Sequence, residues 1–345
     1  MILNSTTIEN SFAEAFSMRF TRLIITALNR RWLENAVTEM CGYGTSVIGC
    51  DAEVGLESWI EPAETLDGRP GASVLLFAFS TKALQQATFN RTGQCLMTCP
   101  TTAVFDGLPE EVNLGESKTN NRLVDFKPHE IQVGDKLRFF GDGFQKSKLI
   151  GERRFWRIPV MDGEFICEDK FGVANGVAGG NLLILAKDQI SGLSAAERAV
   201  DQIAKLPNVI CPFPGGVVRS GSKVGSRYKG LKASTNHPFC PTLRGVDFAA
   251  AAAELENEDS SLQLSRSQLS EEANCVYEIV IDGTDYVSVG QAIVAGVNAA
   301  AGDGVSSITA ANYGGKLGKH QYHLHRMLAG ADALQADQKA THGAS

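Results

Sequence analysis

The sequence has no long hydrophobic run. Its longest apolar stretches, such as "SVLLFAF" and "NLLILA", have the length of strands, far below the ~20 residues that a membrane-spanning helix needs. The first residues, "MILNSTTIENSFAEAF", lack the basic segment and the apolar core of a signal peptide. We therefore expect a cytoplasmic protein without a membrane partner.

The sequence also has no long basic run. It contains 32 basic against 39 acidic residues, for a net charge of −7. Nucleic acids and anionic membranes attract basic surfaces, so neither is an expected partner. With 43% apolar and 21% charged residues, the composition is that of a globular protein, and 345 residues suffice for two domains.

Cysteine pairs and familiar catalytic signatures are missing as well. The eight cysteines are scattered without a CxxC pair, mostly inside apolar runs, which favours structural thiols over a metal site or a disulfide framework. No GxSxG, HExxH or GxGxxG motif is present, and "NYGGKLG" has Leu317 where a P-loop needs Ser or Thr. Covalent catalysis, phosphate hydrolysis and dinucleotide binding are therefore disfavoured.

The stretch "HQYHLH" holds the one group of close histidines, His320, His323 and His325. On a terminal strand, His323 and His325 would share one face while His320 would point away. Two histidines are too few for a closed zinc site without a distant third ligand. We therefore predict no metal site.

The sequence contains an internal duplication. Residues 21–55 read as strand, helix and strand, with Trp32 opening the apolar helical face, Gly42 at the C-cap and "TSVIGC" as the second strand. The stretch from "NLLILA" to "NVICPF" repeats this order, with a helix from about Ser194 to Ala204. Residues 69–103 and 275–318 each add another strand, helix and strand. Each half is β-α-β-β-α-β, which predicts an α+β protein of two duplicated ferredoxin-like lobes.

These repeats set the predicted domains. They are an N-terminal lobe over residues 1–160, a C-terminal lobe over 161–327 and a flexible tail over 328–345. The excursion at 111–136 is polar, and the insertion at 244–273 is acidic. We expect these two surface segments to dock partner subunits.

One carboxylate lies in an unexpected place. The strand predicted for "CVYEIVIDG" puts Val276, Glu278 and Val280 on one face and Tyr277 and Ile279 on the other. Glu278 is either an edge carboxylate that faces water or an arginine, or a carboxylate held in a cleft for acid–base chemistry. The spacing of the residues leaves both readings open.

The chain resembles the formylmethanofuran–tetrahydromethanopterin formyltransferase family over residues 7–327. The resemblance rests on the ordered motifs "FAEAF", "YGTSVIGC", "DGRPG", "RTGQCLMT", "FFGDGF", "GVAGGN", "PFPGG", "SKVGS", "ASTN", "CVYEIVI" and "NYGGKLG" with the closing "HLH". The resemblance implies a reversible formyl transfer between the amine of a methanofuran-type coenzyme and N5 of tetrahydromethanopterin. It implies that both coenzymes are substrates and that no prosthetic group is bound. The family's catalytic glutamate falls on Glu278.

The resemblance also indicates a substrate site and partners. Its glycine-rich turns carry backbone donors, and its lysines are candidate ligands for coenzyme carboxylates or phosphate. The candidate substrate-binding residues are Gly179, Gly180, Asn181, Gly215, Gly216, Ser222, Lys223, Asn312 and Lys316. The expected assembly is a homo-oligomer (a tetramer), and the bacterial form adds the other subunits of a formyltransferase/hydrolase complex. The alternative is a non-catalytic subunit that docks coenzymes; a metal-dependent hydrolase is a weaker rival.

Overall fold

The computed structural model describes residues 1–43, 50–108, 130–219, 236–248, 267–312, 314–316 and 318–330. These residues form two compact units. The N-terminal unit consists of 17–43 and 50–176, and the C-terminal unit consists of 1–16 and 177–330. Residues 1–16 therefore belong with the second half of the chain.

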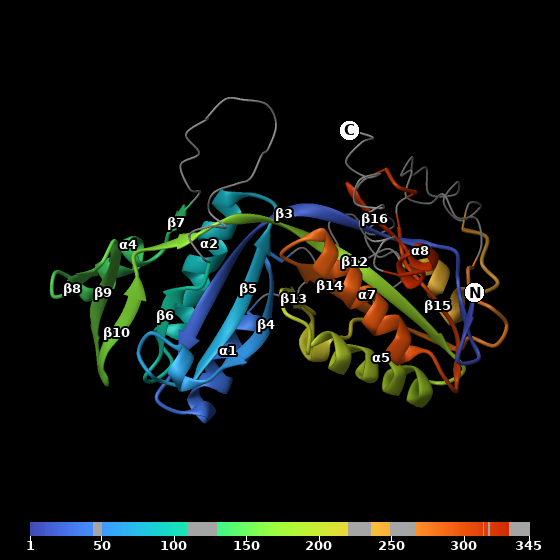
Figure 1. The fold of residues 1–345 in the computed structure, drawn as a ribbon, viewed down its shortest axis with the longest axis horizontal. Helices are drawn as coiled ribbons and strands as arrows, with labels where there is room; N and C mark the ends of the chain where they lie inside the picture. The colour runs from blue at the N-terminus through green and yellow to red at the C-terminus, as the bar shows by residue number, and fades with distance from the viewer. Residues whose placement is uncertain are drawn as a thin grey trace. The chain divides into compact units, whose positions relative to one another are not determined.

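The N-terminal unit is a mixed sheet on which helices α1 and α2 pack (Figure 1). Its first four strands lie in the order β4-β5-β3-β6, and all neighbours in that order are antiparallel. Helix α1 packs on β4 and β5, and α2 packs on β5. The elements are β3 (Phe12–Thr26), α1 (Arg30–Gly42), β4 (Glu53–Ile60), β5 (Gly71–Ala78), α2 (Thr81–Arg91), the π-helical η2 (Thr92–Leu96) and β6 (Ala103–Asp106).

Three further strands extend this sheet beyond β6. Strand β10 is parallel to β6, and β9 and β8 follow in antiparallel pairing, so that β8 is the outer edge. A separate pair of short strands, β7 and β11, lies beside them. The elements are β7 (Glu130–Gln132), α4 (Gly134–Leu137), η3 (Arg138–Gly141), β8 (Lys146–Ile150), β9 (Arg153–Val160), β10 (Gly163–Glu168) and β11 (Lys170–Gly172).

The C-terminal unit repeats the same strand order. Strands β13, β14, β12 and β15 are neighbours in that sequence, all antiparallel, and β2 adds to β15 in parallel. Strand β16 pairs with the first residues of β3. The elements are β1 (Ile2–Leu3), β2 (Thr6–Ile8), β12 (Ala174–Ala186), α5 (Gln189–Ile203), β13 (Val209–Ile210), β14 (Cys275–Gly283), α7 (Tyr286–Ala300), β15 (Val305–Thr309), β16 (His320–His323) and α8 (Leu324–Leu328).

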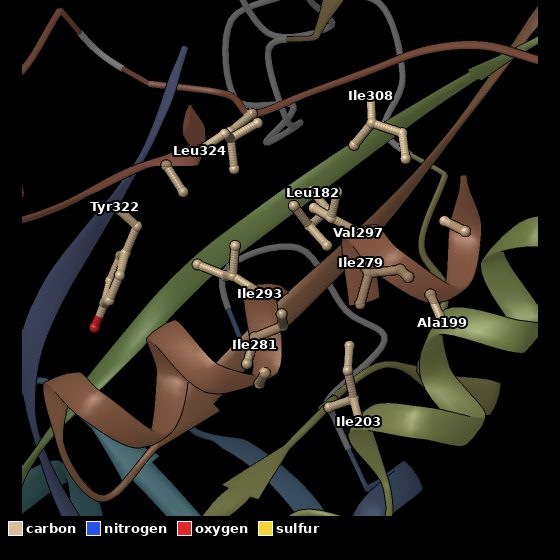
Figure 2. Packing of buried hydrophobic residues seen from close by; sticks show 14 of the residues in the cluster. Leu182, Ala199, Ile203, Ile279, Ile281, Ile293, Val297, Ile308, Tyr322 and Leu324 are labelled. Carbon is tan, nitrogen blue, oxygen red and sulfur yellow. The ribbon is translucent and has the colours of Figure 1, made fainter. Parts of the chain in front are cut away.

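The core of the C-terminal unit lies between this sheet and its two long helices. Figure 2 shows Leu182, Ile279 and Ile281 of the strands beside Ile293 and Val297 of α7. All five side chains are almost completely buried. Helices α5 and α7 also contact each other and β14, so one face of β14 is covered.

The described chain is a mixed α/β protein. Among the helices that the structure describes, none has the length and apolarity to cross a membrane. Helix α1 follows the prediction from its apolar spacing, because Leu33, Ala36, Val37 and Met40 are buried. Asn29 caps its first turn by accepting the Trp32 N–H.

Several predicted boundaries were wrong. Helix α5 begins at Gln189, not near Ser194, because Asp188 is an N-cap that accepts the N–H of Ser191. Gly42 is the last residue of α1, and Tyr43 is the C-cap. The strand predicted for "NVICPF" is only Val209–Ile210, since prolines follow it.

Some predicted segments lie outside the described residues. Of the strand predicted for "TSVIGC", only Cys50 is described, and a strand is found at Glu53–Ile60. Most of the excursion at 111–136, residues 249–266 of the acidic insertion and residues 331–345 of the tail are also outside the description. The excursion ends in β7 and the start of α4.

Candidate functional site

Glu278 lies in the middle of β14, whose bounds coincide with the stretch "CVYEIVIDG". Ile279 and Ile281 point into the core beneath α5 and α7. Val276 points the other way, into a smaller cluster with Leu183 and Phe239. Because side chains alternate along a strand, the half-buried Glu278 shares this second face.

The backbone of Glu278 is fixed on both edges of β14. On one edge it pairs with Leu183 of β12. On the other, the N–H of Val218 donates to the Glu278 carbonyl at 2.8 Å, and the N–H of Glu278 donates to the Val218 carbonyl at 3.1 Å. A carboxylate on a strand held this way has little freedom to shift with its backbone.

The carboxylate itself is oriented by Asn236. The Asn236 side-chain Nδ2 donates to Glu278 Oε2 at 3.0 Å. Asn236 comes from the segment before the short helix η5 (His237–Phe239), whose Pro238 and Phe239 are buried. Packing of η5 therefore holds the donor in place.

Asn181 lies on the same face as Glu278, in the neighbouring strand. It pairs with Val280, so it is diagonal to Glu278, a relationship that corresponds to about 7–8 Å between Cα atoms. Its side-chain amide bonds the backbone of Ala311 twice, accepting the N–H at 2.7 Å and donating to the carbonyl at 3.1 Å. Asn181 thereby fixes the residue that leads into the loop at 312–318.

The glycine-rich loop that follows is anchored by a buried acid, Glu14. The N–H groups of Gly315, at 2.9 Å, and of Gly318 donate to the two carboxylate oxygens of Glu14. Asn312 also binds inward, donating from Nδ2 to the Phe12 carbonyl at 3.2 Å. A Cβ on Gly318 would overlap the Ala15 carbonyl, at 2.5 Å, so the close approach to β3 requires glycine.

Lys316 is the cation that this loop presents. It is exposed, and no carboxylate of the described residues pairs with it. The loop therefore has a rigid base, held by Glu14 and Asn181, and a solvent-facing ammonium group suited to an anionic ligand.

At Gly179 and Gly180, two further candidate substrate-binding residues, the fold itself accounts for the presence of glycine. Gly179 has a φ of +86°, sits in the β12 bulge and donates its N–H to Asp282 Oδ1 at 2.8 Å. A Cβ on Gly180 would lie 2.8 Å from Val289 of α7. The structure therefore turns the Cα hydrogen of Gly180 toward the helices, away from the face of Glu278.

Gly215 and Gly216 form a turn that leads the chain from β13 to Val218. Both have positive φ, and a Cβ on Gly216 would lie 2.6 Å from Val200 of α5. The chain bypasses residues 279–281 of β14 and pairs with this strand again where Val218 bonds Glu278. Ser222 and Lys223 lie outside the described residues.

Three polar residues of this region were not predicted as site residues. Asn236 lies within the motif "ASTN", but its bond to Glu278 joins residues far apart in the chain. Glu14 and Asp282 are carboxylates inside apolar strands, and both are almost completely buried. A carboxylate between apolar residues of a strand is the pattern that indicated Glu278, and the same pattern in the sequence indicates Glu14 and Asp282.

The histidine prediction needs correction. His320 and His323 are the ends of β16, but α8 begins at Leu324, so His325 is helical and does not share a strand face with His323. The Nε2 atom of His325 lies 2.8 Å from the Ile8 carbonyl. In the part of the chain that the structure describes, no three His, Cys, Asp or Glu residues are grouped to hold a metal ion.

All eight cysteines are free thiols. Burial raises the pKa of Cys41 and of Cys211 to about 12, and the Asp282 carboxylate adds to the effect at Cys211. Thiols with such a raised pKa are poor nucleophiles at neutral pH.

Two open hollows lie elsewhere. One of about 510 Å³ is lined by residues of α1 and η2, including Trp32, Glu39 and Cys95. Another of about 500 Å³ lies between α5 and α7. Glu278 lines neither of them, and neither gathers the groups described above.

Comparison with known families and relatives gives one consistent match. A family model described as formylmethanofuran-tetrahydromethanopterin formyltransferase matches residues 1–160, and a model described as the proximal lobe of the same enzyme matches 163–327. The chain is 48% identical to a relative from Methylococcus capsulatus, covering 95% of this chain and all of the relative. It is 44% identical to one from Methanocaldococcus jannaschii, over 95% and 100%. Both relatives carry the name formylmethanofuran–tetrahydromethanopterin formyltransferase.

Two solved structures are similar over nearly the whole chain. One is the formyltransferase from Methanosarcina barkeri, with a TM-score of 0.78, 42% identity and coverage of 95% of this chain and 100% of that one. The other is the formyltransferase/hydrolase complex from Methylorubrum extorquens with methylofuran. Its matching chain has a TM-score of 0.80, 42% identity and coverage of 95% and 98%.

Proposed function

The chain belongs to the formylmethanofuran–tetrahydromethanopterin formyltransferase family, and we propose that Glu278 is the carboxylate that assists its formyl transfer. The enzyme uses a methanofuran-type coenzyme and tetrahydromethanopterin as its substrates. The observation that carries the proposal is the placement of Glu278, which has its backbone paired on both edges of β14 and its carboxylate oriented by Asn236.

The chemistry needs a group of this kind. The amine of one coenzyme attacks the formyl carbon of the other in a ternary complex, forming a C–N bond and a tetrahedral intermediate with a negative oxygen. The attacking amine must lose a proton, and the leaving nitrogen must gain one as the old C–N bond breaks. A fixed carboxylate can accept the first proton and return it to the leaving nitrogen.

The rest of the barrier is lowered by positioning. Both reactants are large, and holding them in attack geometry replaces a bimolecular encounter. Lys316 on the loop anchored by Glu14 and Asn181 is placed for an anionic group of a coenzyme. The other proposed substrate-binding residues are Gly179, Gly180, Asn181, Gly215, Gly216, Ser222, Lys223 and Asn312.

We also propose that the two units are duplicated ferredoxin-like lobes. The support is that β4-β5-β3-β6 and β13-β14-β12-β15 have the same order in the chain and in the sheet, with antiparallel neighbours throughout. In both units the two helices connect equivalent strands.

For assembly, we propose a homotetramer that also binds hydrolase subunits. The second part is supported by the similarity to a chain of the formyltransferase/hydrolase complex. The acidic insertion and the polar excursion are two surfaces that we propose for these contacts.

The direct test mixes the purified chain with formyl-tetrahydromethanopterin and methanofuran, without other subunits. We expect formylmethanofuran to form with the intact chain and to disappear in the reverse direction when tetrahydromethanopterin is added. Binding of both coenzymes without transfer would instead establish the alternative, a non-catalytic docking subunit.

A further inference from the structure

The segment 138–161 of the N-terminal unit exposes more large apolar side chains than a solvated surface needs. Three phenylalanines lie around η3 at the start of β8, two aliphatic residues end β8, and a methionine occupies the β9–β10 turn. They are Phe139, Phe140, Phe144, Leu149, Ile150 and Met161, each more than half exposed. A concentration of this kind marks an interaction surface.

Strand β8 at the centre of this surface is a free edge of the sheet. It pairs with β9 along one side, and no described strand pairs with the other. Strand β8 is the outermost strand of this sheet (Figure 1), and all five of its residues, from Lys146 to Ile150, are exposed. The strand has no proline and no bulge, the devices that commonly keep other chains from pairing with an edge.

The charge of the surface is opposite to that of the protein. Residues 138–161 contain six basic and two acidic residues, whereas the whole chain has a net charge of −7. Lys146, Lys148 and Arg154 have no carboxylate partner among the described residues. Lysines alone can guard an edge against aggregation, but guarding does not explain the apolar side chains at both ends of the strand.

We propose that β8, with the apolar side chains that flank it, is the docking surface for a hydrolase subunit of the formyltransferase/hydrolase complex. The contacting surface of that subunit is apolar with acidic residues around it, and it supplies a strand to the free edge of β8. This inference rests on the assembly proposed above and adds a third contact surface, in the N-terminal unit, to the two insertions proposed there.

A second copy of this chain fits the surface less well. In an isologous contact each β8 would lie beside its own copy, which would bring Lys146 and Lys148 of both copies onto one short pair of strands. Like charges opposite each other destabilise paired strands. An acidic partner avoids this repulsion.

The test compares two leucines of nearly equal exposure in the same unit. Leu149 is 58% exposed on β8, and Leu66 is 60% exposed on the β4–β5 connection. Leu149→Asp and Leu66→Asp are each co-expressed with the hydrolase subunits of the same organism, and the affinity of the purified chain for those subunits is measured. We expect Leu149→Asp to weaken binding at least tenfold and Leu66→Asp to leave it unchanged.

A charge reversal provides a second readout. Lys146→Glu combined with Lys148→Glu should weaken the complex, and added salt should no longer weaken it further, since the attraction is replaced by a repulsion that salt screens. Equal effects of Leu149→Asp and Leu66→Asp, or no effect of either, would overturn the proposal. The proposal would also be overturned if the isolated Leu149→Asp chain formed a smaller oligomer than the wild type, because the surface would then join copies of the chain.

Formyl transfer by each isolated variant is measured in parallel. Normal transfer by Leu149→Asp with lost subunit binding supports the docking surface. Loss of transfer in the intact chain, by contrast, contradicts the proposed function itself. A failure of the docking proposal therefore gives a different result from a failure of the proposed function.

Discussion

Asn236 donates its side-chain N–H to Glu278 across a gap of 3.0 Å. The two residues are 42 positions apart and meet on the face of β14 that the helices do not cover. The bond fixes one oxygen of the carboxylate and hence the direction of the other. A catalytic carboxylate requires such orientation, whereas an edge carboxylate facing water does not.

We predict that Asn236→Ala lowers kcat for formyl transfer at least tenfold while the melting temperature changes little. The carboxylate would lose its orienting donor and sample unproductive geometries. Steady-state kinetics with both coenzymes and a thermal melt measure the two effects. Asn274→Ala is the matched control, because Asn274 also makes one 3.0 Å amide hydrogen bond in the same unit, to the Lys187 carbonyl. Equal losses in the two variants would show that the Glu278 contact has no special role.

Glu14→Gln should destabilise the loop at 312–318. One of the two acceptor oxygens becomes an N–H₂ group that faces a backbone N–H, and an unsatisfied buried donor costs about 1–3 kcal/mol. Because the loop presents Lys316, we expect KM for a coenzyme to rise more than kcat falls. Kinetics and chemical denaturation give both numbers. The exposed Glu9→Gln is the control, and a Glu14→Gln enzyme with wild-type KM would separate this loop from the substrate site.

We predict that the carboxyl group of Asp106 makes the free energy of unfolding of the N-terminal unit depend on pH. Burial raises the pKa of this carboxyl from 3.8 to about 6, with Glu168 nearby adding to the effect. Between these values the folded chain keeps a proton that the unfolded chain has released, so stability falls as pH rises through the interval. From pH 5 to pH 7 this group should cost about 1 kcal/mol of unfolding free energy.

The variant Asp106→Asn should remove that part of the pH slope in denaturant titrations at pH 5 and pH 7. Asp188→Asn is the control, because the Ser191 N–H lowers the pKa of Asp188, and its contribution is constant over this range. Identical slopes in the wild type and Asp106→Asn would contradict the assignment.

Local patterns predicted the elements around the site well. The strand bearing Glu278 and the division of its two faces follow from side-chain alternation, because Ile279 and Ile281 pack beneath the helices while Val276 packs on the other face. The boundary of α5 differs from the prediction because Asp188 follows an apolar run and Lys187, and its capping role depends on the helix that follows. His325 was assigned to a strand because a short terminal helix leaves little periodic signal.

The contacts within the site could not be predicted in the same way. Asn236 meets Glu278, and Glu14 meets Gly315 and Gly318, through tertiary pairing of segments that are distant in the chain. The spacing of residues within one helix or strand does not indicate which residues of distant segments will form hydrogen bonds. What the sequence does offer is the type of position, a carboxylate flanked by apolar residues in a strand, which Glu14, Glu278 and Asp282 share.

The measurement that tests the central claim most directly is the turnover of Glu278→Gln and Glu278→Ala beside the wild type, with a melting curve for each. Gln keeps the shape of the side chain between Val276 and Val280 but cannot carry a proton between two amines. We expect Glu278→Gln to lose about two orders of magnitude or more in kcat with an unchanged fold, and Glu278→Ala to lose more. Near-wild-type turnover in both variants, with normal melting, would show that Glu278 is a structural carboxylate and that the catalytic group lies elsewhere.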